Sequence, residues 1–303
     1  GSGGIATMNR AGEHGAKAAV IEEKKLGGTC VNLGCVPKKI MWYGAQIAES
    51  IHKYGPDYGF TNTGNEFDYA TLRKNREAYI DRARSSYDGS FKRNGVDLIE
   101  GRAEFIDPHT VSVNGELIHA KHIVIATGAH PHIPAIPGAE LGGSSDDVFA
   151  WEELPESVAI LGAGYIAVEL AGVLHTLGVQ TDLFVRRERP LRGFDSYIVE
   201  SLVQEMENTG LNLHTHKVPA KLEETEQGIT IHFEDGSTHS ASQVIWATGR
   251  RPNVEGLQLE KAGVILNERG FIQVDEYQNT VVDGIYALGD VTGEKELTPV
   301  AIK

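Results

Sequence analysis

A short apolar strand followed directly by spaced glycines and a helix constrains the fold of this chain more than any other feature. Residues 157–161 are apolar, Gly162-Ala-Gly164-Tyr-Ile-Ala167 follows them, and residues 168–177 have helical character. Glycines in this setting allow a tight turn and a close approach of the backbone to a pyrophosphate at the start of the helix. The pattern predicts an α/β fold with a Rossmann-like domain that binds a dinucleotide, although a tight turn without a ligand would need the same glycines. The motif residues are Gly162, Gly164, Ile166 and Ala167.

The next strand indicates which dinucleotide binds. Residues 180–185 form the predicted strand, and basic side chains follow where an NAD site would carry an acid. Arginines suit the 2′-phosphate of NADPH because they form charge-assisted hydrogen bonds with it. We therefore expect NADPH rather than NADH, with Arg186 and Arg192 as the main contacts and Arg187 beside them. The alternative is a solvated basic loop that Glu188 partly neutralises.

The only two cysteines, Cys30 and Cys35, lie five positions apart, before a proline and two lysines. Bridging so short a loop stabilises a fold little. In a regular helix the two Cα atoms would be roughly 8–9 Å apart, beyond the usual limit of about 7 Å for a disulfide. Because Gly34 relaxes the backbone and Pro37 suits the first turn of a helix, we expect a distorted turn that leads into a helix N-terminus. The helix dipole and the lysines would favour thiolate there. The segment predicts a redox-active dithiol, with two buried, inert cysteines as the alternative.

Half of a second dinucleotide fingerprint opens the chain, at Gly1, Ser2 and Gly4. A predicted helix over residues 3–15 follows, and a strand then ends in Glu22, where a ribose-binding acid is expected. Near the other end a strand finishes at Asp290, whose carboxylate would accept hydrogen bonds from a polyol unless it is a plain turn acid. A nicotinamide and a disulfide each exchange two electrons, and a flavin is the usual intermediary. FAD in the first domain fits that requirement.

Two matching Ala-Thr-Gly turns, at 126–128 and 247–249, predict the entry to and the exit from an inserted domain. We expect a FAD-binding domain over residues 1–127, an NADPH-binding domain over 128–252, and a return to the first domain over 253–303. The chain starts within a glycine turn and stops within a predicted helix. We therefore expect a fragment of a longer protein, without the first strand of its first domain.

The bulk composition argues against some functions. A net charge of −14 argues against nucleic acid as a partner. No apolar run approaches the roughly 20 residues of a membrane-spanning helix, so no membrane is expected either. A reactive cysteine pair without a visible signal peptide favours a cytoplasmic location.

Several segments together resemble the FAD- and NADPH-dependent pyridine nucleotide-disulfide oxidoreductases, which have two dinucleotide-binding domains. Residues 27–39, 162–169 and 286–290 and both Ala-Thr-Gly turns match in order and spacing, over essentially the whole chain. Within this family the chain is most similar to the members that reduce glutathione disulfide. Lipoamide and mercuric members typically carry serine at the position of Lys38, and lipoamide dehydrogenases lack the arginines.

The resemblance implies a role for each matching residue. Cys30 would attack the substrate disulfide, and Cys35 would contact the flavin. Glu169 would pair with a lysine near the reactive flavin nitrogen, Lys38 by preference and Lys39 otherwise. The remaining implied contacts are Thr29, Gly128, Asp290 and Thr298 with FAD, Tyr165 and Gly249 with NADPH, and Tyr87 with glutathione.

The resemblance also implies a substrate and an oligomeric state. Ala6, Asn9 and Arg10 would border the substrate, and a small residue near a cation suits anionic glutathione disulfide. In this family the proton donor is a histidine from the C-terminal domain of the partner subunit, and none of the 12 histidines lies in a matching segment. We expect a homodimer when the protein is complete, and a fragment that lacks the dimerisation domain and full activity. The alternatives are another NADPH-dependent disulfide reductase (of trypanothione, mercuric or lipoamide type) and a non-catalytic FAD-binding fragment.

Overall fold

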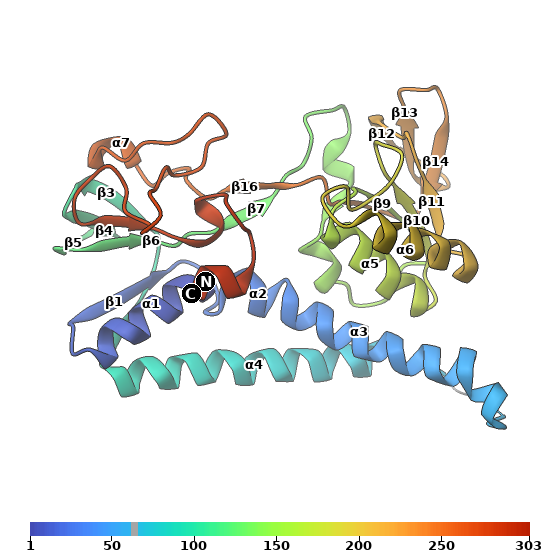
Figure 1. Cartoon of the computed structure of the whole chain (residues 1–303), viewed down its shortest axis with the longest axis horizontal. Coiled ribbons are helices and arrows are strands. Elements are labelled where there is room, and N and C mark those ends of the chain that lie inside the picture. The colour runs from blue at the N-terminus through green and yellow to red at the C-terminus, as the bar shows by residue number, and fades with distance from the viewer. Residues whose placement is uncertain (62–65) are drawn as a thin grey trace. The chain divides into compact units, whose positions relative to one another are not determined.

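The computed structural model describes residues 1–61 and 66–303, which form two compact units (Figure 1). Unit 1 comprises Gly1–Val36, Ala78–His130 and Arg250–Lys303, and unit 2 comprises Pro37–Glu77 and Pro131–Gly249. The boundaries expected near residues 128 and 252 lie close to two of these borders. Residues 37–77 differ from the expectation, because they pack with unit 2 through buried Met41, Ala45 and Tyr69.

Unit 1 combines short sheets with helices. Its parallel pairs are β1 (Ala18–Glu22) with β2 (Val96–Glu100) and β6 (Ile123–Ile125) with β17 (Ile285–Ala287). Its antiparallel sheet consists of β3 (Ala103–Asp107), β4 (Thr110–Val113) and β5 (Glu116–His119). Its short helices include α1 (Ser2–Glu13), α2 (Gly28–Asn32), α7 (Leu259–Ala262), the 3₁₀ turn η5 (Gly289–Val291) and α8 (Thr298–Ile302).

Glycines allow α1 to pack at backbone distance against the rest of unit 1. A Cβ atom on Gly3 would lie 2.3 Å from Leu288 Cδ1 and 2.8 Å from the Ala301 carbonyl oxygen. A Cβ on Gly12 would lie 2.4 Å from the Asn94 carbonyl oxygen. Larger side chains at these positions would push the helix away, so the packing fixes where its first turn lies.

Unit 2 is built on a parallel five-stranded sheet in the order β11-β10-β9-β15-β8 (Figure 1). The strands are β8 (Gly143–Ser144), β9 (Ser157–Leu161), β10 (Gln180–Phe184), β11 (Asn212–His214) and β15 (Gln243–Trp246). Residues 158–161 of β9 are buried, as expected for a parallel strand covered on both faces. The chain builds outward from β9 to β10 and β11 on one side and later adds β15 on the other. The carboxyl end of β9 is therefore a topological switch point, where such sheets bind ligands.

Unit 2 also contains two helices and an antiparallel meander. They are α5 (Tyr165–Thr176), α6 (Ser196–Thr209) and the antiparallel strands β12 (Pro219–Thr225), β13 (Gly228–Phe233) and β14 (Thr238–Ala241). Asp195 caps α6, since its carboxylate accepts hydrogen bonds from the backbone N–H groups of Tyr197 and Ile198.

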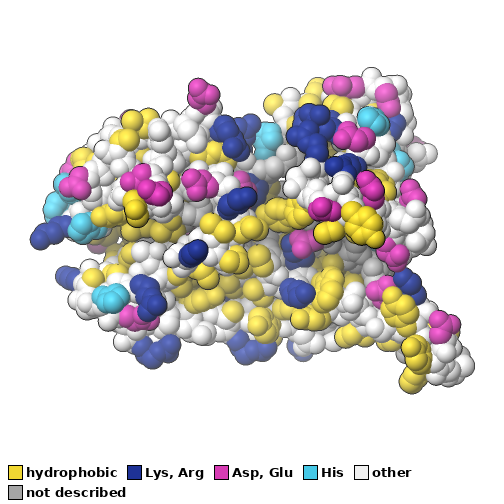
Figure 2. Space-filling model, in the orientation of Figure 1, with side chains coloured by type: hydrophobic (Ala, Val, Ile, Leu, Met, Phe, Trp, Pro, Cys, Tyr) yellow, Lys and Arg dark blue, Asp and Glu magenta, His cyan; other side chains and the backbone are white. Residues whose placement is uncertain are grey.

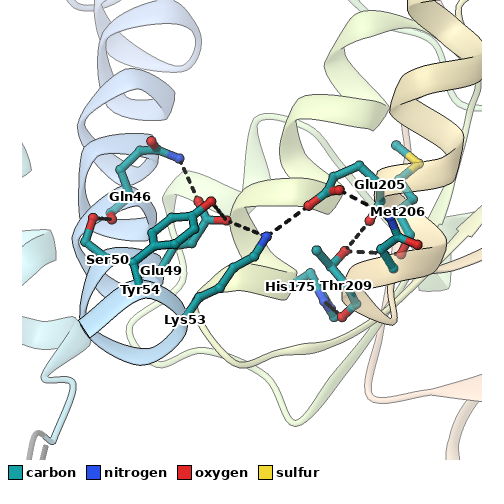
Figure 3. A network of polar contacts seen from close by, with 10 residues as sticks. Gln46, Glu49, Ser50, Lys53, Tyr54, His175, Glu205, Met206 and Thr209 are labelled. Carbon is teal, nitrogen blue, oxygen red and sulfur yellow. Dashed lines mark hydrogen bonds and ion pairs between the residues drawn. The ribbon is translucent and has the colours of Figure 1, made fainter. Parts of the chain in front are cut away.

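Two longer helices are α3 (Cys35–Glu49) and α4 (Tyr69–Asn94). Within unit 2, a π-helical turn η1 (Ser50–Tyr54) extends α3. Figure 3 shows Lys53 of this turn between two carboxylates, 3.3 Å from Glu49 Oε1 and 3.0 Å from Glu205 Oε1 on α6. A cavity of about 600 Å³ beside them is lined by residues near the C-terminal ends of α3, α5 and α6. Lys53 thus ties α3 to the helices of the parallel sheet.

Candidate active site

The two cysteines lie on either side of a break between α2 and α3. Cys30 belongs to α2, Leu33 leaves the helical conformation, and α3 begins at Cys35. A Cβ on Gly34 would lie 3.0 Å from the Thr29 carbonyl oxygen, so a small residue is favoured at the break. The predicted distorted turn is confirmed. No disulfide joins the two sulfurs in this structure, and Cys30 is partly buried while Cys35 is exposed.

The electrostatics of Cys30 differ from the expectation. Hydrogen bonding with Cys35 and burial raise the pKa of the Cys30 thiol, and a hydrogen bond with Thr298 lowers it only in part. The prediction that the surroundings favour thiolate is therefore wrong for Cys30. The physical reason is that the hydrogen bond with Cys35 and burial outweigh the hydrogen bond with Thr298.

Thr298, at the start of α8, brings a hydroxyl to the dithiol. Its Oγ1 lies 4.0 Å from Cys35 Sγ. Tyr87 on α4 also lies within the electrostatic reach of Cys30, because burial first and Cys30 second raise the pKa of its phenol. Of the predicted site residues, Thr298 thus lies beside Cys35, and Tyr87 is close enough to Cys30 to feel its charge.

The residues of α1 that were predicted to border the substrate have other contacts. Asn9 Oδ1 accepts a hydrogen bond of 2.8 Å from Asn94 Nδ2. Arg10 donates to Glu13 at 2.7 Å and is well exposed. Ala6 is partly buried on the same helix. A role of these three residues in substrate binding stays a prediction.

Lys38 and Glu169 form an ion pair within unit 2. The lysine side chain is 17% exposed and its ammonium also lies 5.9 Å from the centre of the Tyr165 ring, so its position is well determined. Lys39 instead lies 3.7 Å from the centre of the Trp42 ring. The structure therefore pairs Glu169 with Lys38, the preferred lysine, and gives Lys39 a different contact.

The start of α1 has the features of a dinucleotide site. Gly1 caps the helix, and its nitrogen lies 3.7 Å from Glu22 Oε2 at the end of β1. Gly28 has φ +63°, and a Cβ on it would lie 2.4 Å from Gly1 Cα, so α2 approaches α1 at backbone distance. A helix N-terminus beside a strand-end carboxylate can hold a pyrophosphate and a ribose. Ser2 and Gly4 belong to the same first turn and Thr29 to α2. These residues fit FAD.

Asp290 lies in the turn η5, and its partner was missed in the sequence analysis. Burial raises the pKa of Asp290, while Arg250 lowers it from 3.5 Å away. Arg250 begins the short strand β16 (Arg250–Pro252), which pairs with β7 (Ala129–Pro131). The repeated Ala-Thr-Gly turns mark these strands, so the Arg-Arg-Pro after the second turn was the available signal. Gly128 adopts φ +72° directly before β7, and its carbonyl accepts the N–H of Asn253.

The glycine motif lies at the carboxyl end of β9. A Cβ on Gly162 would lie 2.2 Å from the Ala247 carbonyl oxygen, so only glycine fits there. A Cβ on Gly164, which caps α5, would meet no described atom within 4 Å, so open space remains in front of the helix N-terminus. Ala167 is completely buried, and its small side chain lets α5 pack closely. Ile166 is partly buried in the same turn. This cradle fits the pyrophosphate of a dinucleotide.

The predicted phosphate-binding arginines follow β10. Arg186, Arg187 and Arg192 are all exposed. The pKa of Glu188 lies below its usual value, through a hydrogen bond with its own backbone and then through Arg187 and Arg189. Figure 2 shows Lys and Arg side chains gathered on one face of unit 2. Gly249, at φ +130°, accepts a hydrogen bond from the His132 N–H at the exit of the same unit. The arrangement suits NADPH.

Two further classes of site are not seen in the described part of the chain. Within residues 1–61 and 66–303, no helix is long and apolar enough to cross a bilayer. Over the same ranges, no group of three or more His, Cys, Asp or Glu side chains is arranged to hold a metal ion.

Comparisons with known proteins identify the family of this chain. The model of the family "Pyridine nucleotide-disulphide oxidoreductase" matches residues 1–303. The chain is 45% identical over 313 residues to the glutathione reductase of Schizosaccharomyces pombe and 41% identical over 320 residues to that of Yarrowia lipolytica. These matches cover all of this chain and 67% and 68% of those proteins. The HOCl-induced flavoprotein disulfide reductase RclA from Escherichia coli has a similar structure, with a TM-score of 0.89 and 28% identity over 100% of this chain and 67% of RclA. The chain therefore belongs to the pyridine nucleotide-disulphide oxidoreductase family.

Proposed function

We propose that this protein is a flavoprotein disulfide reductase that uses NADPH and FAD to reduce glutathione disulfide through Cys30 and Cys35. The observation that carries the proposal is the pair of cysteines on either side of the break between α2 and α3, with the Thr298 hydroxyl beside Cys35. The two dinucleotide cradles, at α1 and α5, supply places for both cofactors. The similarity to two glutathione reductases supports the choice of substrate.

The chain's own residues perform the sulfur chemistry. Cys30 attacks one sulfur of glutathione disulfide, so the substrate S–S bond breaks, a mixed disulfide forms and the first glutathione leaves. Cys35 then attacks the Cys30 sulfur, which closes the Cys30–Cys35 disulfide and releases the second glutathione. The two protons of the dithiol end on the two glutathione thiols. Because the pKa of Cys30 is raised, a base must remove its proton when the attack begins.

The cofactors complete the cycle. When bound, FAD and NADPH supply the two electrons that reopen the Cys30–Cys35 disulfide. Glu169 orients Lys38, which would hold a fixed positive charge near the flavin. Glu22 and Asp290 would bind hydroxyl groups of FAD. Tyr165 would cover the nicotinamide pocket.

Spectroscopy and thiol release test this proposal. The purified chain is incubated with FAD, freed of excess cofactor, reduced with NADPH and mixed with glutathione disulfide. We expect flavin absorbance that NADPH bleaches, followed by release of glutathione. In a Cys30→Ser variant the bleaching should remain and the release should stop. A colourless protein would contradict flavin chemistry, and release from another disulfide alone would assign a different substrate.

We also propose a homodimer and a cytoplasmic location. Apolar side chains follow α3 toward its end (Figure 2), and Tyr43 and Ile47 are 56% and 61% exposed. Such a stripe would be covered by a second subunit. A dithiol that cycles with a reductant suits a reducing compartment. Sedimentation equilibrium and cell fractionation test the two proposals.

A further inference from the structure

Arg250 connects three separate segments of unit 1. Its side chain is 8% exposed, and Nη2 donates a 2.5 Å hydrogen bond to the Ala129 carbonyl oxygen on β7. The same nitrogen lies 3.5 Å from Asp290 Oδ2, and Nε lies 3.4 Å from Glu296 Oε2. One buried cation thus joins the strand pair β7–β16 to both ends of the segment that leads from η5 toward α8.

Arg250 lowers the pKa of both acids around it. Burial raises the pKa of Asp290, and Arg250 opposes this shift. Burial also raises the pKa of Glu296, which Asp290 raises further, while Arg250 and then Arg269 lower it. The guanidinium between them therefore favours the ionised form of both half-buried carboxylates, because a nearby opposite charge offsets the cost of burying an anion.

The segment held by Arg250 also reaches the dithiol. Glu296 lies two residues before Thr298, whose hydroxyl is 4.0 Å from Cys35 Sγ. Asp290 at one end is the proposed polyol acceptor for FAD, and Thr298 at the other is a proposed flavin contact. A shift of Arg250 would therefore disturb both ends of this segment.

We infer that Arg250 is a positioning residue for FAD, which holds Asp290 and the segment up to Thr298 in the arrangement that binds the cofactor. The inference rests on the proposed function, since it assumes that this site takes FAD. Arg250 itself need not contact the cofactor, because it acts through the two carboxylates and the Ala129 carbonyl.

Flavin fluorescence titrations of the full chain test this role. We compare wild type with Arg250→Gln, Arg250→Lys, the double variant Arg250→Gln/Glu296→Gln, and the neighbouring exposed Arg251→Gln as a matched control. Arg250→Gln should weaken FAD roughly 10- to 100-fold, the range expected for losing a charge-assisted hydrogen bond. The loss should deepen as the pH falls from 8 to 5.5, because Asp290 then protonates more readily without Arg250. Arg250→Lys and the double variant should recover part of the affinity, and Arg251→Gln should bind FAD like wild type.

The outcomes separate the possibilities. FAD affinity and pH dependence in Arg250→Gln equal to those of wild type would overturn the inference. Equal losses in all three Arg250 variants, together with a reduced far-UV circular dichroism signal, would indicate a purely structural role and would overturn it as well. If the wild-type chain itself does not bind FAD, the proposed function fails, and that result is distinguishable because it appears without any mutation.

Discussion

Replacing Arg186 with Glu and Arg192 with Leu in one protein should weaken NADPH far more than NADH. Both guanidinium groups are exposed, so solvent screens each contact with the 2′-phosphate to about 1 kcal/mol. The introduced carboxylate adds repulsion of about 1 kcal/mol at exposed distances. The loss of about 3 kcal/mol corresponds to a roughly 100-fold weaker affinity. NADH lacks the 2′-phosphate and should lose little.

Competitive titration of the two nucleotides, followed by the quenching of tryptophan fluorescence, measures both affinities. Arg189→Leu is the matched control, since it removes a positive charge from the same loop without a predicted contact. Raising the salt concentration should weaken NADPH in wild type and leave NADH nearly unchanged. Equal losses for NADPH and NADH, or an equal effect of the control variant, would refute the assignment of these arginines.

Three further predictions concern charge and protons. Glu169→Gln should slow bleaching of the flavin by NADPH about tenfold while the FAD content stays constant, because Lys38 loses the carboxylate that orients it. Stopped-flow absorbance measures the rate of bleaching, and an unchanged rate would argue against a role of the ion pair. The alkylation rate of Cys30 in the reduced protein should keep rising with pH beyond about 8.5, because a raised pKa means that the thiolate forms only at higher pH. Mass spectrometry measures the alkylation rate, and a plateau below that pH would contradict the raised pKa. Burial lowers the pKa of His239, so as the pH falls the unfolded chain binds the proton before the folded chain does, and the free energy of unfolding should decrease once the pH is below about 6.5. Urea titrations at several pH values measure this dependence. His239→Gln should make it weaker, and an unchanged dependence on pH would refute the role of His239.

Much of the fold was accessible from local patterns. The strand over residues 157–161 and the end of the first strand at Glu22 were predicted as the structure has them, because each strand is a short, mainly apolar run between turn signals. The meander around β12 and β14 was less visible, since its partly exposed strands contain charged and polar residues. The grouping of residues 37–77 with unit 2 could not be predicted, because it depends on long-range packing of Met41 and Ala45 rather than on local sequence.

In the candidate site, too, some features are visible in the local sequence and others depend on long-range contacts. The glycine cradle and the cysteine pair are local signals, since the backbone geometry of a tight turn or a helix break is encoded within a few residues. Arg250 was missed because its importance arises from Asp290 and Glu296, which lie 40 and 46 residues away along the chain. Partners this distant are found only when the fold brings them together.

The dithiol shows that a local motif predicts where two cysteines lie better than it predicts their pKa values. Two lysines follow Cys35 in the sequence, and a charge argument based on spacing alone places them beside the sulfurs. In the structure Lys38 pairs with Glu169 and Lys39 lies over Trp42. The groups that act on the pKa of the Cys30 thiol, besides burial, are Cys35 and Thr298. The raised pKa of Cys30 leaves less thiolate at a given pH, and thiolate is the form that reacts. In the proposed exchange a base therefore has to take the proton of Cys30 before its sulfur attacks.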